Sequence, residues 1–171
     1  MARNIEIKAR VSDLDGIARS VATFADSGPI EIAQDDTFFK CQRGRLKLRE
    51  FADGSGELIF YRRPDQAGPK ECFYVISPTS APGDLREFLS LALGQAGRIV
   101  KARTLFMVGR TRVHLDRVKG LGQFLELEVV LGEDEPEAVG VEEADALIER
   151  IGIDRSQLIE GAYVDLLVAP A

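Results

Sequence analysis

Alternating apolar and polar residues predict β-strands along most of the chain. In segment 4–10 the apolar residues occupy one face of an extended strand. The other face carries Asn4, Glu6, Lys8 and Arg10. Taken alone, this pattern is typical of a strand whose polar face meets water. The same alternation, with similar charges, returns in several later strands, which suggests that their polar faces share one environment.

The pattern predicts about eight strands and several helices. The strands are expected at 4–10, 30–39, 45–51, 57–63, 71–77, 98–108, 111–118 and 124–131. Helices are expected from Ser12 to the Gly28-Pro29 break, at 82–94 and at 142–151, with a helical turn at 154–158 and an apolar piece at 163–167. So many antiparallel strands tend to close, because closure removes sheet edges. We therefore predict an α+β fold, an eight-stranded antiparallel β-barrel with helices packed outside, as a single domain over residues 1–171.

Length and composition narrow the function classes. The chain has 171 residues, of which 45% are hydrophobic and 29% charged, as expected for one globular domain. No apolar run approaches the ~18 residues of a membrane span. The chain starts without a signal-peptide pattern, so we expect a cytoplasmic protein with reduced Cys41 and Cys72. The single histidine, His114, excludes a multi-histidine metal site, and we expect it to orient a neighbour or to stay neutral.

The net charge of −6 is unevenly distributed. Segment 98–119 contains seven Lys or Arg residues and one acidic residue, Asp116. A basic middle in an acidic protein argues against a nucleic-acid surface, which usually gives a basic domain. It favours cations gathered at one internal anionic site.

Helices packed outside would cover the apolar strand faces, so the charged faces are expected to line the interior. The candidate cations are Lys8, Arg45, Lys47, Arg49, Arg62, Arg63, Lys101, Arg103 and Arg112. One interpretation is an ion-pair lattice without a ligand, since buried charges must be paired. However, the cations outnumber the acids, and excess positive charge in a confined space favours a polyanion such as phosphate.

The acidic residues of the same faces form a second candidate cluster. They are Glu6, Asp116, Glu126 and Glu128. Oxygen ligands without histidine or cysteine suit Mg²⁺ or Mn²⁺, which bridge carboxylates and phosphates. Acids and cations in one lumen together predict a metal-dependent site for a triphosphate group.

Several segments resemble the CYTH superfamily, the triphosphate tunnel metalloenzymes. Segment 4–8, Asn-Ile-Glu-Ile-Lys, is similar to the Glu-x-Glu-x-Lys strand of that family, with Asn4 in place of its first glutamate. Segments 36–39, 46–49, 61–64 and 101–103 also resemble family stretches. Segments 113–128 and 161–167 look like the branch of class IV adenylate cyclases. The resemblance extends over most of the chain.

The resemblance implies roles for individual residues. Phosphate oxygens would be held by Lys8, Lys47, Arg49, Arg62, Arg103 and Arg112. Metal ions, Mg²⁺ or Mn²⁺, would be held by Glu6, Asp116, Glu126 and Glu128. The catalytic group would comprise Glu6, Lys8, Glu126 and Glu128.

The resemblance leaves three functions open. The first is adenylate cyclase, which converts ATP into cyclic AMP and pyrophosphate. The second is a triphosphatase acting on inorganic triphosphate, thiamine triphosphate or a nucleoside triphosphate, and the third is a non-catalytic binder of polyphosphate or nucleotide. In each case the partner is a triphosphate-bearing small molecule, with no nucleic acid and no membrane. Whether the chain forms a homodimer is open.

Overall fold

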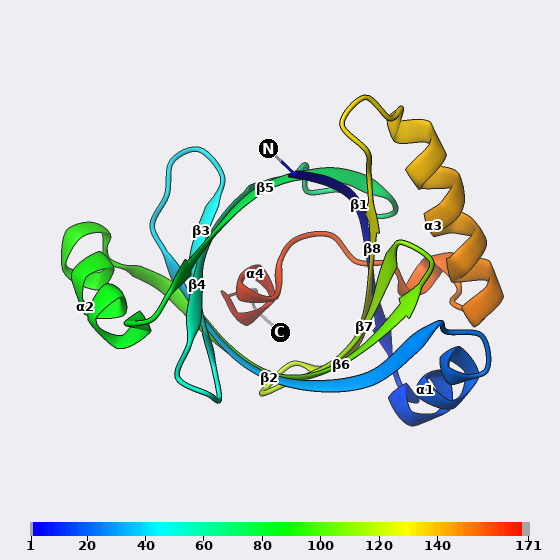
Figure 1. The fold of residues 1–171 in the computed structure, drawn as a ribbon, viewed down its shortest axis with the longest axis horizontal. Coiled ribbons are helices and arrows are strands. Elements are labelled where there is room, and N and C mark those ends of the chain that lie inside the picture. Colours follow the sequence, from blue (N-terminus) through cyan, green and yellow to red (C-terminus); the bar gives the residue numbers. More distant parts are fainter. Residues whose placement is uncertain (1, 169–171) are drawn as a thin grey trace.

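The computed structural model describes residues 2–168, and its main feature is a closed barrel of eight antiparallel strands (Figure 1). The strands are β1 (Ala2–Val11), β2 (Ser27–Phe39), β3 (Arg45–Phe51), β4 (Gly56–Arg62), β5 (Lys70–Thr79), β6 (Gln95–Val108), β7 (Thr111–Val118) and β8 (Gly122–Val130). Around the barrel they follow the order β1-β5-β4-β3-β2-β6-β7-β8. The predicted barrel with helices outside is therefore confirmed.

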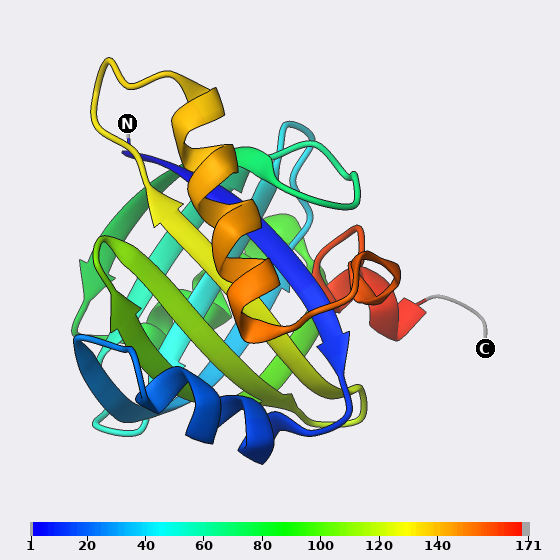
Figure 2. The same cartoon turned by 90° about the vertical axis from the view of Figure 1, so that its right-hand side faces the viewer.

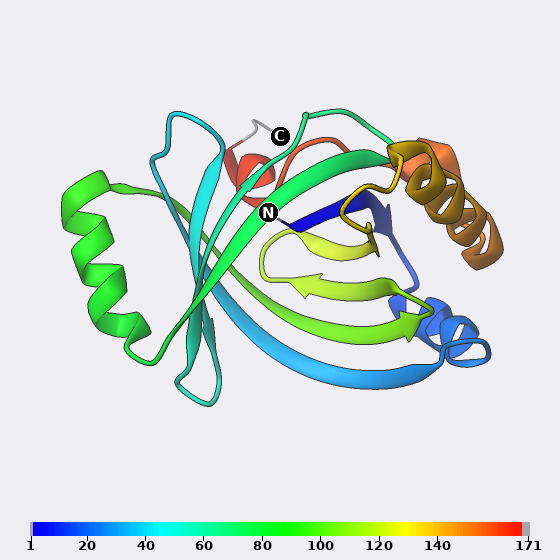
Figure 3. The same ribbon diagram turned by 45° about the horizontal axis from the view of Figure 1, so that its top comes forward.

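The helices lie outside the barrel wall or against its end. They are α1 (Leu14–Ala22), α2 (Pro82–Leu93), α3 (Glu137–Ile151), the 3₁₀ turn η1 (Arg155–Gln157) and α4 (Tyr163–Val168). Helix α3 runs across β1 and β8 (Figure 2). Together with α1 it covers the largest apolar cluster, which includes Ile7, Leu115 and Leu127. Helix α2 lies on the opposite side of the barrel (Figure 3).

Helix α4 packs across one end of the barrel, near the centre of the ring in Figure 1. Its residues Tyr163 and Val164 join a buried cluster with Phe38, Ile99 and Phe124 from the strands below. Gly97 permits this contact, because a Cβ at that position would lie 2.5 Å from Val164 Cγ2. We call this the closed end of the barrel and the opposite end its mouth.

Some predicted element boundaries were wrong. Helix α1 begins at Leu14 because Asp13, not Ser12, caps it by accepting a hydrogen bond from the Gly16 amide at 2.8 Å. The same helix ends at Ala22, so β2 starts at Ser27 and is longer than expected. Helix α3 begins at Glu137 instead of Glu142.

Within residues 2–168, no helix is both long enough and apolar enough to cross a membrane.

Candidate functional site

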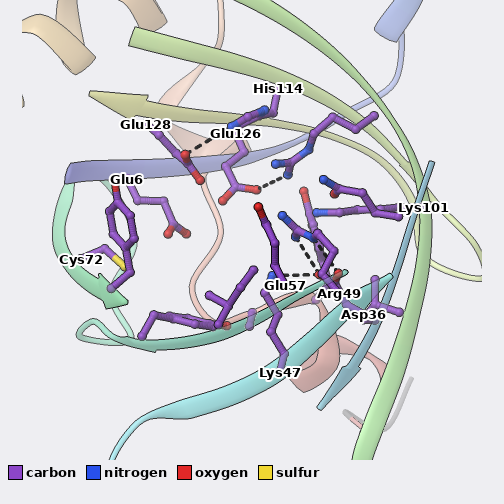
Figure 4. Close-up of a pocket in the computed structure, with 18 of the residues that line it drawn as sticks. Glu6, Asp36, Lys47, Arg49, Glu57, Cys72, Lys101, His114, Glu126 and Glu128 are labelled. Atoms are coloured by element: carbon purple, nitrogen blue, oxygen red, sulfur yellow. Dashed lines mark hydrogen bonds and ion pairs between the residues drawn. The ribbon is translucent and has the colours of Figure 1, made fainter. Parts of the chain in front are cut away.

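The barrel encloses a cavity of about 340 Å³ that receives side chains from all eight strands and from α4 (Figure 4). Its lining contains most of the predicted site residues. Those present are Glu6, Lys8, Lys47, Arg49, Arg103, Arg112, Glu126 and Glu128. The charged strand faces therefore converge on one internal space, as the alternation predicts.

The strand register arranges the inward residues in layers. A layer is traced from strand to strand, starting at Glu6 on β1. We take the register partner on the neighbouring strand, move two residues along that strand towards the closed end, and repeat this around the barrel. After eight strands the path returns to Glu6. This lower layer contains Glu6, Glu126, Asp116, Lys101, Asp36, Lys47, Tyr61 and Cys72. The same rule gives an upper layer of Asn4, Glu128, His114, Arg103, Gln34, Arg49, Ile59 and Tyr74.

Two further layers bound the charged ones. The floor layer, under α4, contains Lys8, Phe124, Val118, Ile99, Phe38, Arg45, Arg63 and Lys70. The mouth layer contains Ala2, Val130, Arg112, Leu105, Ile32, Phe51, Glu57 and Ile76. Charged residues therefore occupy the floor and the two middle layers, whereas the mouth layer is mostly apolar.

Asp36 fixes two of the phosphate-binding candidates. Its carboxylate accepts hydrogen bonds from Arg49 Nε and Nη2 and from Lys47 Nζ, all at 2.8 Å. Burial alone would raise the pKa of Asp36, but Lys47 and Arg49 outweigh burial and hold this pKa well below its usual range. Asp36 therefore stays ionised and presents the two cations to the lumen.

Asp116 has a similar role on β7. It accepts bonds from Arg103 Nε and Nη2 at 2.7 Å, from Lys101 Nζ at 3.2 Å and from the Tyr163 hydroxyl at 3.0 Å. The side chain is 0% exposed. Burial would raise its pKa, but Arg103 and Lys101 hold the pKa well below its usual range.

The metal-ligand role of Asp116 stays a prediction, and the structure shows a different set of partners around its carboxylate. Both of its oxygens are engaged by protein donors, and Asp116 lies outside the cavity lining. Its position beside two buried cations makes it their counter-ion instead.

The remaining acids gather on two neighbouring strands. We call Asn4 and Glu6 of β1 together with Glu126 and Glu128 of β8 the oxygen patch. Glu6 lies directly opposite Glu128 in the register, so two like charges face each other. Such a pair is destabilising unless a cation lies close by.

The cation contacts of Glu6 are long. Its Oε1 lies 3.5 Å from Lys8 Nζ and 3.4 Å from Arg63 Nε. Glu126 Oε2 lies 3.5 Å from Lys8 Nζ and 3.0 Å from Arg103 Nη2. Glu128 is held more closely, with Arg112 Nε at 2.7 Å. These contacts neutralise the patch only in part.

The donor chemistry of the oxygen patch fits a hard divalent cation. It offers three carboxylates, and Asn4 Oδ1 is buried without a hydrogen-bond partner within residues 2–168. In the structure these side chains are directed to their cation partners, and no three Asp, Glu, His or Cys side chains of the described chain converge as preformed ligands. Metal binding at the patch would therefore exchange ion pairs for metal contacts.

The structure corrects the placement of Arg62. Its side chain is exposed and does not line the cavity, whereas Arg63 does. On β4 the inward positions are Glu57, Ile59 and Tyr61, so alternation directs Arg62 outward. The Arg63 side chain is 1% exposed, and its Nε and Nη1 have no hydrogen-bond partner in the described chain. Arg63 is therefore the better anion-binding candidate, a choice that exact register alone could have made.

Three further residues lie at the lumen, namely Lys101, His114 and Tyr163. Lys101 lies in the lower layer, where burial first and Arg103 second lower its pKa to about 7. His114 is buried with Nε2 3.3 Å from Glu128 Oε2, a contact that lacks hydrogen-bond geometry. Burial lowers the pKa of His114, which favours its neutral form. The Tyr163 ring lies beneath Lys8 Nζ at 4.3 Å and closes the floor of the lumen.

Comparisons with known proteins agree with this geometry. The family model of the CYTH domain matches residues 2–163. The adenylate cyclase CyaB of Aeromonas hydrophila is 24% identical over 166 residues, covering 93% of this chain and 85% of that protein.

Solved structures share the fold. The PH1012 protein of Pyrococcus horikoshii matches with a TM-score of 0.83 at 22% identity, covering 95% of this chain and 98% of its own. HpAC1 of Hippeastrum, described with a dominant triphosphatase activity, matches with a TM-score of 0.66 at 15% identity. That match covers 98% of this chain and 94% of HpAC1.

Proposed function

Because this chain belongs to the CYTH domain family, we propose that it is a divalent-metal-dependent adenylate cyclase of the class IV type. Members of the family are enzymes that act on triphosphates, and they generally depend on a divalent metal. The observation that carries the proposal is the division of the lumen. Lys47, Arg49 and Arg103 point in from one side, and the oxygen patch lies on β1 and β8.

The cations would bind the phosphate chain. Arg49 and Arg103 present planar guanidinium groups that are already oriented by Asp36 and Asp116, so little ordering is needed when phosphate arrives. Lys8 and Lys47 add point charges beside them. Together they would neutralise the charge that moves onto the leaving phosphates during the reaction.

The oxygen patch would hold the metal, with Glu6, Glu126 and Glu128 as charged ligands and Asn4 Oδ1 as a neutral one. We propose Mg²⁺ or Mn²⁺, since all of these ligands are hard oxygens. The bound metal would draw electron density from the phosphate oxygens.

In the cyclase reaction the ribose 3′-oxygen forms a bond to the α-phosphorus, and the bond from that phosphorus to the pyrophosphate oxygen breaks. The 3′-hydroxyl proton is lost to the medium. The contribution of the chain is charge neutralisation and alignment of the two oxygens in line. The likeness to CyaB favours this reaction among the chemistries of the family.

Triphosphatase activity is the second candidate, favoured by the likeness to HpAC1. In that case water attacks the terminal phosphorus of inorganic triphosphate, thiamine triphosphate or a nucleoside triphosphate. A non-catalytic binder is the third, and the neutral Asn4 favours it, since the patch has one charge fewer than four acids would give.

One incubation separates the three. The protein is given Mg²⁺ or Mn²⁺ with ATP and, separately, with tripolyphosphate, and the products are resolved by chromatography. Cyclic AMP and pyrophosphate would support the cyclase, and orthophosphate the triphosphatase. Tight binding without turnover would support the binder, and neither binding nor turnover would contradict the proposal as a whole.

A further inference from the structure

The mouth of the cavity differs chemically from the layers beneath it. Ile32, Phe51 and Ile76 line the cavity there, and none of them can bind phosphate. We propose that this end binds the heterocyclic base of a nucleoside triphosphate, with Phe51 as the stacking surface and Gln34 as the hydrogen-bonding group. This inference rests on the proposed function and names the residues that would distinguish a nucleotide from inorganic triphosphate.

Gln34, Phe51 and Ile32 form one continuous surface. Gln34 and Phe51 are register partners on β2 and β3, so their side chains leave the sheet side by side on the same face. Ile32 lies two residues nearer the mouth on β2 and therefore shares that face. All three line the cavity. The surface combines a flat aromatic ring, an aliphatic side chain and one amide.

The amide of Gln34 lacks a partner for its oxygen. The residue is 5% exposed, and its Oε1 has no hydrogen-bond partner within residues 2–168. A buried acceptor without a donor is costly, so this position favours a ligand that brings an N–H group. Ring and exocyclic nitrogens of a nucleobase provide such donors.

Inorganic triphosphate does not satisfy the Gln34 oxygen. Its ionised oxygens can accept a hydrogen bond from Gln34 Nε2, but they bring no donor for Oε1. The mouth layer contains one cation, Arg112, whose Nε is engaged by Glu128 at 2.7 Å, and the carboxylate of Glu57 adds negative charge there. Phosphate is therefore favoured deeper in the lumen, and an organic group is favoured at the mouth.

The order of groups along the lumen also matches a nucleotide. Gln34 lies beside Lys101 in the register and shares its layer with Arg49 and Arg103. The surface formed by Gln34, Phe51 and Ile32 is therefore next to the proposed phosphate-binding cations, on the side nearer the mouth. A nucleoside triphosphate connects base, sugar and phosphates in this order.

Calorimetric titration tests the inference, with ATP and tripolyphosphate as the two ligands in the presence of EDTA, so that neither is turned over. We expect the wild-type protein to bind ATP about tenfold more tightly than tripolyphosphate, the order of one base stacked on an aromatic ring. Phe51→Ala and Gln34→Leu should each remove most of this preference, while tripolyphosphate affinity changes less than about twofold.

Matched variants guard against misfolding and nonspecific effects. Phe51→Leu keeps apolar volume without the aromatic ring and should also lose ATP affinity. Phe88→Ala removes a phenylalanine that is 66% exposed on α2, outside the barrel, and should leave both affinities unchanged.

The outcomes separate this inference from the function on which it rests. Tripolyphosphate bound as tightly as ATP, in wild type and variants alike, would overturn the base site while leaving triphosphate binding intact. Binding of neither ligand would contradict the proposed function itself. Loss of affinity for both ligands in Phe51→Leu and Gln34→Leu would also overturn the base site, because the effect would not be specific to the base.

Discussion

Two sets of buried carboxylates lie in the same lumen, and they are held differently. Asp36 and Asp116 each use both oxygens to bind an arginine, at 2.8 Å and 2.7 Å respectively. Glu6 reaches its cations only at 3.4 and 3.5 Å. The comparison shows that ion pairing has two roles here. The aspartates form a scaffold that orients arginines, whereas Glu6 is held only loosely; Glu126 and Glu128 lie between these cases, at 3.0 Å from Arg103 and 2.7 Å from Arg112.

The difference follows from the neighbouring strands. Asp36 has Arg49 as its register partner, and Asp116 has Arg103, so each aspartate faces an opposite charge across the sheet. Glu6 faces Glu128. Because like charges cannot satisfy each other, Glu6 depends on cations from other positions, whereas Glu126 faces Lys8 and Glu128 faces Arg112 across the sheet.

Removing a scaffold carboxylate should have the largest effect. Asp116→Asn leaves Arg103 and Lys101 buried without their counter-ion, and breaking a buried pair typically costs about 3–5 kcal/mol. We expect the free energy of unfolding in urea to fall by this order. The control Asp15→Asn breaks an exposed pair with Arg117 and should cost at most about 1 kcal/mol. Equal losses in both variants would remove the distinction between scaffold and surface pairs.

Altering the oxygen patch should instead affect metal-dependent turnover. In Glu126→Gln and Glu128→Gln one metal ligand loses its charge, and we expect the metal-dependent rate to drop about 100-fold or more. The unfolding free energy should change far less than in Asp116→Asn. Initial rates and Mn²⁺ titration followed by electron paramagnetic resonance measure both effects. Unchanged Mn²⁺ affinity would exclude these carboxylates as ligands.

Arg49→Ala should weaken triphosphate binding. A hydrogen bond to a charged group is worth about 1.5–3 kcal/mol, so the Kd for tripolyphosphate should rise at least about tenfold. Arg62→Ala is the matched control, since that arginine is exposed outside the lumen. Calorimetry with adenosine, which carries no charge, gives the second control, and an equal loss for adenosine would argue against a phosphate contact.

The smallest expected effect concerns the charge of Lys101. The pKa of this lysine is lowered to about 7 by burial and Arg103, against about 10.4 in the unfolded chain. Between these values the unfolded state binds more protons, so the unfolding free energy should rise with pH, by at most about 1.4 kcal/mol per unit. Lys101→Met should flatten this rise in urea titrations at pH 7, 8 and 9. The same slope in both proteins would assign the rise to another group.

The barrel was predictable because strict alternation is a local signal. The polar positions of β1, β3, β6 and β8 were assigned to the lumen from periodicity together with the expected barrel covered by helices, and the structure places Glu6, Lys47, Arg103 and Glu126 there. Because basic and acidic residues occupy the same polar strand faces, the sequence also predicted that both would line the lumen.

The sequence was less informative where the strand register determines which side chains meet. Arg62 and Arg63 are consecutive, so their side chains point to opposite faces of the sheet. At the end of β4 the sequence does not show which of the two faces the lumen. Asp116 carries the same carboxylate as Glu126, and only the partner across the sheet makes it a counter-ion. Gln34 gave no signal, because a single amide in a strand is common and its missing partner is visible only in three dimensions.

We propose that one side of the lumen binds phosphate while the oxygen patch binds metal. A crystal of the protein grown with Mn²⁺ and tripolyphosphate, with anomalous scattering recorded for manganese, tests it most directly. We predict a manganese peak beside Glu6, Glu126 and Glu128, and phosphate density against Arg49 and Arg103. Manganese or phosphate bound only outside the barrel would contradict the account.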